Sequence, residues 1–420
     1  MTSTAADSAQ PWTCPFCPLL CDGFALAREG GRYRLQGSDC PRAAAALARF
    51  DDAAAAQAAP QVDGRTVTLE EALDAAAALL AASRQPLIAG LGTDVDGARA
   101  LYPLACATGA ISDAAGGEGF LHGLRSLQDR GHFTTTLAEV RTRAELIVCI
   151  GGTPRETLPE IWRRAGIGEP QVPQREIVFV GAPTDPALDG LPGVTQRSIG
   201  LAGDLFDTVG LLAARVAQRR LPAPPELDAL AGRLRDARYA VLMWESARLP
   251  AHGTLIVEAL NQIVADLNRH TRAALLHFGH SAGPGTANQV YTWMSGLPLR
   301  SRPGPLGLEH EPLQFDARAL LAGGDVDALL WVASFGDEPA RPEVELPTVV
   351  LGGPGVAAPP RGVYIPVATP GIGQGGHLFR GDGVVALPLE PVREDRLPGV
   401  GQVARAIAQR VNATRRQAAA

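Results

Sequence analysis

The segment YAVLMWESARLPAHGTLIVEALNQIVADLNRHTRAALLHFG, residues 239–279, decides the fold. It begins with a β-rich apolar run at 239–245, continues with helical apolar spacing at 253–270, and ends with a second apolar run at 273–279. Short apolar runs on either side of an amphipathic helix are typical of two buried parallel strands joined by a helical crossover. The segment therefore predicts a strand–helix–strand unit of an α/β protein.

The same alternation extends in both directions along the chain. Further apolar runs lie at 86–90, 145–151, 176–181, 327–333, 348–353 and 362–368, and helical spacing recurs at 69–83. Most of the runs end in glycine, which suits the tight turn after a buried parallel strand. Alternating strands and helices imply parallel sheets that are covered by helices on both faces.

One Pro-rich polar run, RRLPAPPELD at 219–228, reads as a linker between two α/β parts. The predicted fold class is therefore α/β, with doubly wound parallel sheets in two Rossmann-like units. The predicted domains are a cysteine-rich N-terminal domain at 1–58, a first α/β domain at 59–220 and a second at 228–420.

Composition excludes several classes of function. The net charge of −6 over 420 residues argues against a nucleic-acid binder, which needs a clustered basic face. All 38 basic residues are arginine, which excludes a lysine Schiff base, a P-loop lysine and a lysine general base. No apolar run reaches the ~18 residues of a membrane span, and the N-terminus shows no secretory signal. A cytoplasmic protein is expected.

Four of the six cysteines are crowded into the first 40 residues. They form Cys14-x₂-Cys17-x₃-Cys21, and Cys40 follows after 18 residues (40 − 21 − 1). Four thiolates at this spacing favour a [4Fe–4S] cluster over zinc, which remains an alternative. A third interpretation is that buried cysteines cluster here by chance and bind no metal. The other two, Cys106 and Cys149, are expected to be inert residues on apolar faces.

Several separated segments resemble the molybdopterin oxidoreductase superfamily, and most closely the B-type subunit of formylmethanofuran dehydrogenase. Besides the cysteine motif they are GFLHGLRSLQDRG at 119–131, with Gln128, Asp129 and Gly131 in register, IVCIGGTPRETLPEIWRR at 147–164, TANQVYTWMSGLPL at 286–299, and GIGQGGHLFRGDGVVALPLEP at 371–391. The resemblance covers most of the chain and is specific when these segments are taken together.

The family's chemistry needs a protein sulfur or selenium on molybdenum or tungsten, a neighbouring histidine, and an arginine that orients the one-carbon acid. By resemblance these positions fall on Leu121, His122 and Phe278, and a second histidine persists as His280. A leucine cannot ligate a metal, and a phenylalanine cannot clamp a carboxylate. We therefore predict a degenerate site in which no residue is assigned a catalytic role.

The resemblance also indicates that molybdopterin or tungstopterin is absent. Gly181 stands where relatives often place an Asp-Pro pair for the guanine nucleotide, and His377 replaces a threonine of the C-terminal Gly-Gly-Thr segment. The stretch GLGTDVDG at 90–97 does not meet the G-x-G-x-x-G dinucleotide pattern. We therefore assign no residue of this chain to the binding of a pterin cofactor.

This pattern of loss resembles the B-type chains of bacterial formyltransferase/hydrolase complexes in tetrahydromethanopterin-linked oxidation of formaldehyde to formate. The resemblance implies amidohydrolase-like and formyltransferase-like partner chains, a structural role without redox chemistry, and no C-terminal β-barrel. The main alternative is an active molybdenum or tungsten formylmethanofuran dehydrogenase chain with an iron–sulfur cluster. A module that only transfers electrons is the third hypothesis, disfavoured because the chain has no second set of cysteines.

Overall fold

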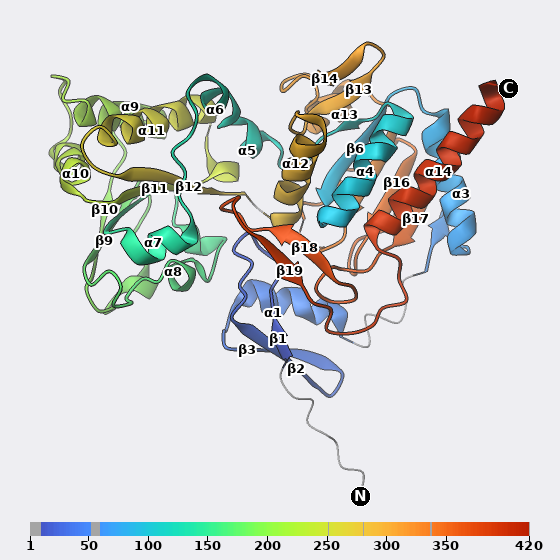
Figure 1. The fold of residues 1–420 in the computed structure, drawn as a ribbon, viewed down its shortest axis with the longest axis horizontal. Helices are drawn as coiled ribbons and strands as arrows, with labels where there is room; N and C mark the ends of the chain where they lie inside the picture. The colour runs from blue at the N-terminus through green and yellow to red at the C-terminus, as the bar shows by residue number, and fades with distance from the viewer. Residues whose placement is uncertain (1–9, 52–58, 251, 280, 337, 420) are drawn as a thin grey trace, which may run out of the picture. The chain divides into compact units, whose positions relative to one another are not determined.

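The computed structural model describes residues 10–51, 59–250, 252–279, 281–336 and 338–419 of the chain. The chain divides into two compact units (Figure 1). Unit 1 comprises Met1–Gly117 together with Ser281–Ala420, and unit 2 comprises Glu118–His280. Unit 2 is therefore an insertion in the sequence of unit 1.

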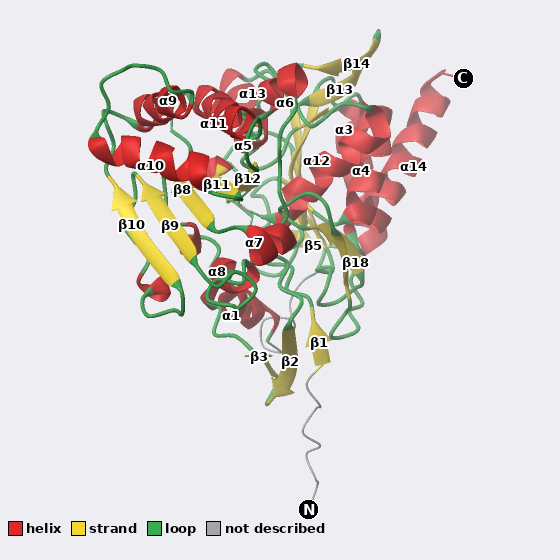
Figure 2. Cartoon of the chain, turned by 60° about the vertical axis from the view of Figure 1, so that its left-hand side comes forward, coloured by secondary structure: helices red, strands yellow, loops and turns green. Residues whose placement is uncertain are grey.

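Unit 2 is built on a five-stranded sheet in the order β10-β9-β8-β11-β12, and all neighbouring strands are parallel. The strands are β8 (Leu146–Ile150), β9 (Arg175–Val180), β10 (Val194–Ile199), β11 (Ala240–Glu245) and β12 (Ala273–Phe278). The helices are α5 (Glu118–Leu121), α6 (Leu124–Arg130), α7 (Leu137–Arg143), α8 (Ile161–Arg164), α9 (Leu205–Val216), α10 (Pro225–Asp236) and α11 (Gly253–Leu267). Figure 2 shows β10, β9 and β8 side by side.

Helices cover both faces of this sheet. The apolar sides of α9, α10 and α11 share one core with alternate residues of the strands, including Val148, Val178 and Leu242. On the opposite face Trp162 of α8 meets Phe179 edge-on, with ring centroids 6.3 Å apart. Burial on both faces explains why these strands read as continuous apolar runs rather than as alternating ones.

The strand order of unit 2 reverses at its centre. From β8 the chain proceeds outward through β9 to β10, and it then returns to the other side of β8 for β11 and β12. The carboxyl ends of β8 and β11 therefore flank the topological switch point, where open α/β sheets usually bind ligands.

Unit 1 is built on a nine-stranded sheet in the order β14-β13-β7-β6-β15-β16-β17-β4-β5. The central strands β7 (Ile111–Ser112), β6 (Pro86–Gly92), β15 (Ala328–Ala333), β16 (Thr348–Gly352) and β17 (Gly362–Pro366) are parallel. Antiparallel edges are formed by β13 (Ser301–Gly304) with β14 (Gly307–His310), and by β4 (Gln61–Val62) with β5 (Arg65–Thr66). A separate hairpin pairs β18 (Gly376–Phe379) with β19 (Ala386–Leu389).

Five helices of unit 1 follow its N-terminal part in the sequence, and side chains cap the first turn of several of them. They are α3 (Leu69–Ala82), α4 (Val95–Thr108), α12 (Ala282–Ser295), α13 (Ala317–Gly323) and α14 (Val400–Ala419). Thr68 and Glu71 form a capping box on α3, and Asp94 caps α4 through the backbone N–H of Gly97. Helix α14 is tied to α4 by the ion pair of Arg405 with Asp96.

The N-terminal part of unit 1 forms a small sheet of its own. Strands β1 (Gln10–Trp12), β2 (Phe24–Glu29) and β3 (Arg32–Gln36) are antiparallel and are followed by α1 (Pro41–Leu47) and the 3₁₀ turn η1 (Ala48–Phe50). The Trp12 indole N–H donates to the carbonyl of Gly371 over 2.8 Å, which fastens this sheet to the C-terminal part of the unit.

The mixed α/β class with parallel sheets is confirmed, and strands occupy all the runs that the sequence predicted, but the domain boundaries are wrong. The run 219–228 does not separate two units, because β8 and β11 on either side of it pair in one sheet. Likewise β6 pairs with β15 although more than 200 residues lie between them, a pairing that local pattern cannot show. Residues 59–220 and 228–420 are therefore not separate domains.

One cysteine prediction is also wrong. Cys149 lies buried on β8 as expected, but Cys106 is exposed on α4. A helix in an alanine-rich segment places small residues on its solvent side as readily as on its buried side, so apolar neighbours did not locate this thiol. Within the described ranges no helix has the length and apolarity needed to cross a membrane.

Candidate functional site

The four N-terminal cysteines lie on two neighbouring pieces of backbone in unit 1. Cys14, Cys17 and Cys21 belong to the loop between β1 and β2, and Cys40 is the residue that precedes α1. The loop is closed by a 2.9 Å hydrogen bond from the Cys14 backbone N–H to the carbonyl of Cys21. The structure thus brings the predicted motif to one end of α1.

All four cysteines are buried, and the same part of unit 1 contains a cluster of buried aromatic rings. The ring of Phe16 lies between Trp12 and Phe50, with centroids 6.0 Å from each. The guanidinium of Arg49 lies over the Phe16 ring, 5.8 Å from its centroid. The four buried thiols therefore belong to a segment that also forms an aromatic cluster with Arg49 stacked on it.

The thiols are close enough to influence one another's ionisation. Burial raises the pKa of Cys14 well above its ordinary value, and negative charge on Cys17, Cys21 and Cys40 raises it further. Yet no three histidine, cysteine, aspartate or glutamate side chains in the described part of the chain converge on a single metal ion. A tetrahedral zinc with Zn–S bonds of about 2.3 Å would hold its sulfurs about 3.8 Å apart, whereas a four-iron cluster holds them further apart.

The family-like stretch in unit 2 contains no metal-ligating side chain at its key position. Leu121 ends the short helix α5 and is half-buried, and His122 follows it and is buried. The His122 imidazole packs directly against Gly253 at the start of α11, where a Cβ atom would lie within 2.7–2.9 Å of the ring. Gln128 and Asp129, which the resemblance keeps in register, are exposed on α6.

Helix α5 lies at the carboxyl ends of β11 and β12. A Cβ on Gly119 would lie 3.1 Å from the Cβ of Ser246, which follows β11, and the Phe120 ring lies 4.0 Å from the Cβ position of Gly279. Phe278, the last residue of β12, is fully buried. The structure therefore places Phe278 in the core at the strand end, and His280 lies outside the described residues.

Sequence reasoning missed a polar cluster at the same strand ends. The His277 imidazole stacks on the indole of Trp244, with centroids 5.1 Å apart and an interplanar angle of 23°. Its Nδ1 lies 3.3 Å from the Ser246 hydroxyl. Burial, reinforced by repulsion from His132, lowers the pKa of His277 to about 4, so the ring is neutral at physiological pH.

The topological switch point of unit 2 is filled by side chains. Glu245 accepts a hydrogen bond from the Thr157 hydroxyl and pairs with Arg248, which also pairs with Glu156 over 2.7 Å. Burial raises the pKa of Glu245 even though Thr157 and Arg248 favour its charged form. The cavity left among these residues measures about 10 Å³, which is room for about one water.

The ends of β8 and β9 are also covered. The Leu205 side chain lies 2.7 Å from the Cβ position of Gly151, and Leu201 lies 2.6 Å from that of Gly181. Asp185, the acid nearest along the chain to Gly181, is buried and accepts a hydrogen bond of 2.7 Å from the Trp162 indole. This carboxylate therefore connects the loop after β9 to α8.

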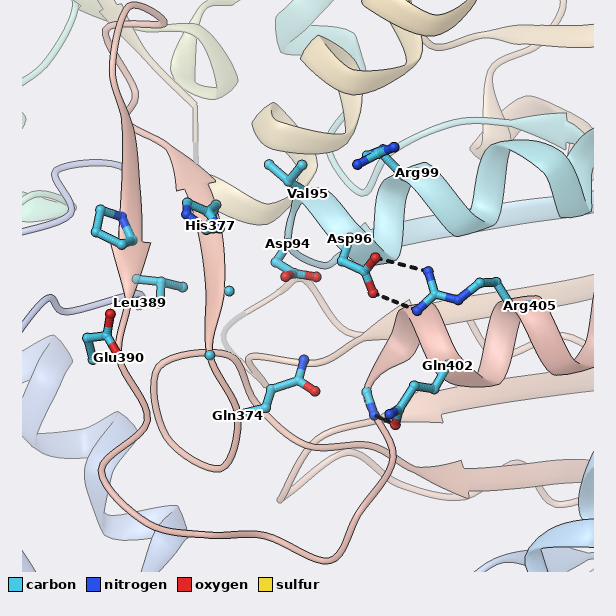
Figure 3. Close-up of a pocket in the computed structure, with 14 residues that line it drawn as sticks. Asp94, Val95, Asp96, Arg99, Gln374, His377, Leu389, Glu390, Gln402 and Arg405 are labelled. Carbon is cyan, nitrogen blue, oxygen red and sulfur yellow. Dashed lines mark hydrogen bonds and ion pairs between the residues drawn. The ribbon is translucent and has the colours of Figure 1, made fainter.

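Unit 1 carries a larger pocket, of about 560 Å³, at the start of α4 (Figure 3). It brings together the turn after β6 and the Gly-Gly-His segment of β18, which the sequence left far apart. Asp94 lies at its base, where burial raises the pKa of the carboxyl. Glu390, Arg99 and His377 line it, while Arg405 and Asp96 are joined by two hydrogen bonds of 2.9 Å. The pocket is therefore lined by both acidic and basic side chains.

Comparison with known proteins adds a family to this geometry, although no family model matches the chain. The chain is 32% identical over 324 residues to the B-type subunit of the formyltransferase/hydrolase complex of Methylorubrum extorquens, covering 76% of this chain and 87% of that protein. It is 25% identical over 423 residues to the B-type subunit of a tungsten-containing formylmethanofuran dehydrogenase of Methanocaldococcus jannaschii, covering 91% and 95% of the two chains.

A solved structure is similar as well. A chain in the crystal structure of the Methylorubrum extorquens formyltransferase/hydrolase complex with methylofuran superposes with a TM-score of 0.74 at 30% identity. The match covers 85% of this chain and 99% of that chain. The fold and the sequence therefore point to the same group of relatives.

Proposed function

The chain belongs to the family of B-type subunits of formylmethanofuran dehydrogenase, and we propose that within a formyltransferase/hydrolase complex it is a structural subunit without redox chemistry. The complex serves one-carbon metabolism, in which a formyl group is transferred to a carrier and released as formate. Transfer and hydrolysis move no electrons, so neither step needs a redox centre in this chain. The amidohydrolase-like and formyltransferase-like chains would carry out both steps.

The observation that carries the proposal is the core position of Phe278. The resemblance gives this position to the arginine that orients the one-carbon acid, and here it is a fully buried aromatic ring. Together with Leu121 at the metal-ligand position, it removes two of the three groups that the family's redox chemistry needs.

The residues of unit 2 do not fit a pterin nucleotide. The end of β9, where the resemblance places the nucleotide, is covered by Leu201, and the neighbouring end of β8 is covered by Leu205. The switch point beside them is occupied by the Glu245–Arg248 pair. An anionic diphosphate would have to displace the buried Leu205 and the partly exposed Leu201 and approach two carboxylates, so we infer that molybdopterin and tungstopterin are absent. The mixed charge of the unit 1 pocket supports the same inference.

The cysteine segment does fit a metal centre. Four buried thiols, three in one loop and the fourth just before α1, are a donor set for iron or zinc, and their spacing favours a [4Fe–4S] cluster over zinc. Cys14, Cys17, Cys21 and Cys40 would hold it. Such a cluster would fix the N-terminal segment as a small cysteine-rich domain, and its thiolates need a reducing compartment, which favours the cytoplasm.

The competing function is an active molybdenum or tungsten chain in which water or sulfide replaces the protein ligand. In that function the side chains that cover the strand ends of unit 2 would have to move aside for a cofactor. The Phe278 ring would also have to leave its buried position so that an anion could bind there.

His122→Ala in the assembled complex tests the proposal. We expect formate release from the formyl carrier to stay within about twofold of wild type, because His122 packs against Gly253 and takes no part in the chemistry. Leu121→Cys should be equally silent. The exposed His270→Ala is the matched control. A tenfold loss of formate release in fully assembled His122→Ala, with the control unaffected, would show that this pocket still takes part in catalysis.

A further inference from the structure

The β13–β14 hairpin of unit 1 carries an unusual amount of exposed leucine. Leu306 at its turn is 98% exposed, Leu308 on β14 is 46% exposed, and Leu313 just beyond β14 is 84% exposed. Leu306 and Leu313 are the most exposed large apolar side chains of the described residues. Single exposed leucines are ordinary, but three within eight residues on one hairpin mark an interaction surface.

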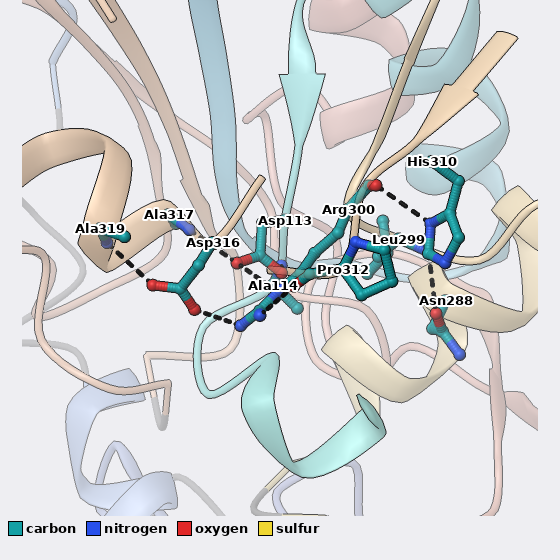
Figure 4. A network of polar contacts seen from close by, with 10 residues as sticks. All are labelled: Asp113, Ala114, Asn288, Leu299, Arg300, His310, Pro312, Asp316, Ala317 and Ala319. Carbon is teal, nitrogen blue, oxygen red and sulfur yellow. Dashed lines mark hydrogen bonds and ion pairs between the residues drawn. The ribbon is translucent and has the colours of Figure 1, made fainter. Parts of the chain in front are cut away.

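The root of this hairpin is held by a buried charge network (Figure 4). Arg300, immediately before β13, is buried, and its guanidinium pairs with Asp316 and, over 3.3 Å, with Asp113. The same guanidinium donates to the carbonyl of Pro312 over 2.6 Å. Arg300 thereby links the strand that opens the hairpin to the segment that leaves it.

The backbone at the root is equally constrained. Arg300 has a φ of 64°, a conformation that non-glycine residues seldom adopt. Its N–H donates to the carbonyl of Ser112 over 2.8 Å, and its carbonyl accepts from the N–H of Glu311 over 3.1 Å. The imidazole Nδ1 of His310 lies 3.0 Å from the same carbonyl.

Asp113 connects this root to the body of the unit. Its carboxylate accepts hydrogen bonds of 2.9 Å from the backbone N–H groups of Ala114 and Ala317. Burial raises the pKa of Asp113 to about 6 in spite of the nearby Arg300 charge. The network therefore attaches both ends of the hairpin, Arg300 before β13 and the segment after β14, to Asp113 in the body of unit 1.

From this rigid root and apolar tip we propose that residues 301–313 dock this chain onto a different subunit of its complex, with Leu306 and Leu308 inserted in an apolar recess of that partner. The inference rests on the proposed function, since it presumes assembly. A hairpin that is fixed before binding loses little conformational entropy when it docks. Its function would be that of a preformed anchor.

The exposed area argues for a heteromeric partner and against a second copy. The three leucines expose roughly 230 Å² of apolar surface if a fully exposed leucine contributes roughly 100 Å². A stable interface buries about 800 Å² per partner, and a two-fold dimer would have to be self-complementary on this one patch. The hairpin is therefore large enough for one anchor within a wider interface between unlike chains.

Paired variants of the full chain test the proposal during assembly of the complex. Leu306→Ser combined with Leu308→Ser should leave the melting temperature of the isolated chain unchanged and weaken its binding to the remaining subunits at least tenfold. Leu221→Ser in unit 2, where the leucine is 48% exposed, is the matched control and should bind like wild type. Unaltered affinity of the double variant would overturn the proposal, as would an isolated wild-type dimer that the double variant dissociates.

A labelling measurement covers the case in which the double variant fails to fold. Leu306→Cys, made in a Cys106→Ser background, should react with a thiol reagent in the isolated chain and be at least tenfold protected in the complex. Leu221→Cys in the same background should react equally in both. Full reactivity of Leu306→Cys in the assembled complex would refute docking through the hairpin. If the wild-type chain fails to assemble with any partner, the proposed function itself is refuted.

Discussion

The cysteine segment of unit 1 and the α5 segment of unit 2 resemble the two metal-binding regions of the same family, but they retain different things. Around Cys14 the donor side chains are present and buried, in a segment that also holds the aromatic pair of Trp12 and Phe16. Around Leu121 the donor is missing, and Phe278 and Trp244 fill the neighbouring strand ends with apolar side chains. The first region keeps the donor side chains of the family's motif, and the second has lost its donor.

The difference separates two roles that a metal can have in such a chain. A metal bound by cysteines from two segments stabilises the fold whatever the chain's activity, because the cross-link forms only in the folded state. A redox metal is useful only if substrate, ligand and proton carrier meet on it. A chain that keeps the cysteine ligands but lacks the ligand of the redox metal is consistent with our proposal of a structural subunit.

The largest effect is expected from breaking the cysteine segment. Cys14→Ser with Cys17→Ser should destabilise the N-terminal sheet by more than about 5 kcal/mol, since a structural metal contributes on the order of 10 kcal/mol to a small metal-dependent fold. Limited proteolysis and co-purification should show cleavage before residue 50 and loss of assembly. Cys106→Ser, on the exposed side of α4, is the control and should change neither. Normal assembly of the double variant would mean that the cysteines are merely buried thiols.

The next largest effect should come from restoring the arginine that relatives carry. Phe278→Arg places a charge in a fully buried position and should lower the free energy of unfolding by about 4 kcal/mol or more. Phe278→Leu should lower it by only about 1 kcal/mol, because most of the apolar contact remains. Chemical denaturation of both variants measures the difference. A well-tolerated arginine that binds formate would indicate an open site and contradict the core position of Phe278.

The pH dependence of stability sharpens the comparison further. The pKa of His277 in the folded chain is about 4, below its ordinary 6.5. Between these two pH values the unfolded chain therefore binds a proton on His277 that the folded chain does not bind. The contribution of His277 is therefore complete above pH 6.5 and is lost as the pH falls to 4, by at most about 3 kcal/mol. His277→Gln should flatten this part of the stability profile. If His277→Gln left the loss of stability between pH 6.5 and 4 unchanged, the His277 ring would have to be solvated rather than stacked on Trp244.

These regions also show how far sequence reasoning reaches. The runs at 145–151 and 239–245 were correctly predicted as strands because burial on both faces leaves a continuous apolar signal. That β6 pairs with β15 across the whole of unit 2 was not predictable, because sheet order depends on pairings between distant segments. The Pro-rich run 219–228 therefore marked a loop between α9 and α10 and not a domain boundary.

In the candidate site, too, residues that are close in the sequence could be predicted as a group, whereas residues brought together only by the fold could not. Spacing alone predicted Cys14, Cys17, Cys21 and Cys40 as one ligand group, and the structure places three of them in one loop and the fourth just before α1. Nothing in the neighbourhood of His277 indicated that it would stack on Trp244, because the two residues meet only through the register of β11 and β12. Glu245 and Arg248, which occupy the switch point, gave no pattern that distinguishes them from ordinary surface charges.

The most direct test of the structural role is metal and pterin analysis of the purified complex, with Mo, W, Fe and Zn counted together and dye reduction by formate assayed in parallel. We predict iron bound at the cysteine segment, no molybdenum or tungsten, no pterin, and no dye reduction while formate release proceeds. Stoichiometric molybdenum or tungsten accompanied by formate-dependent dye reduction would contradict the structural role.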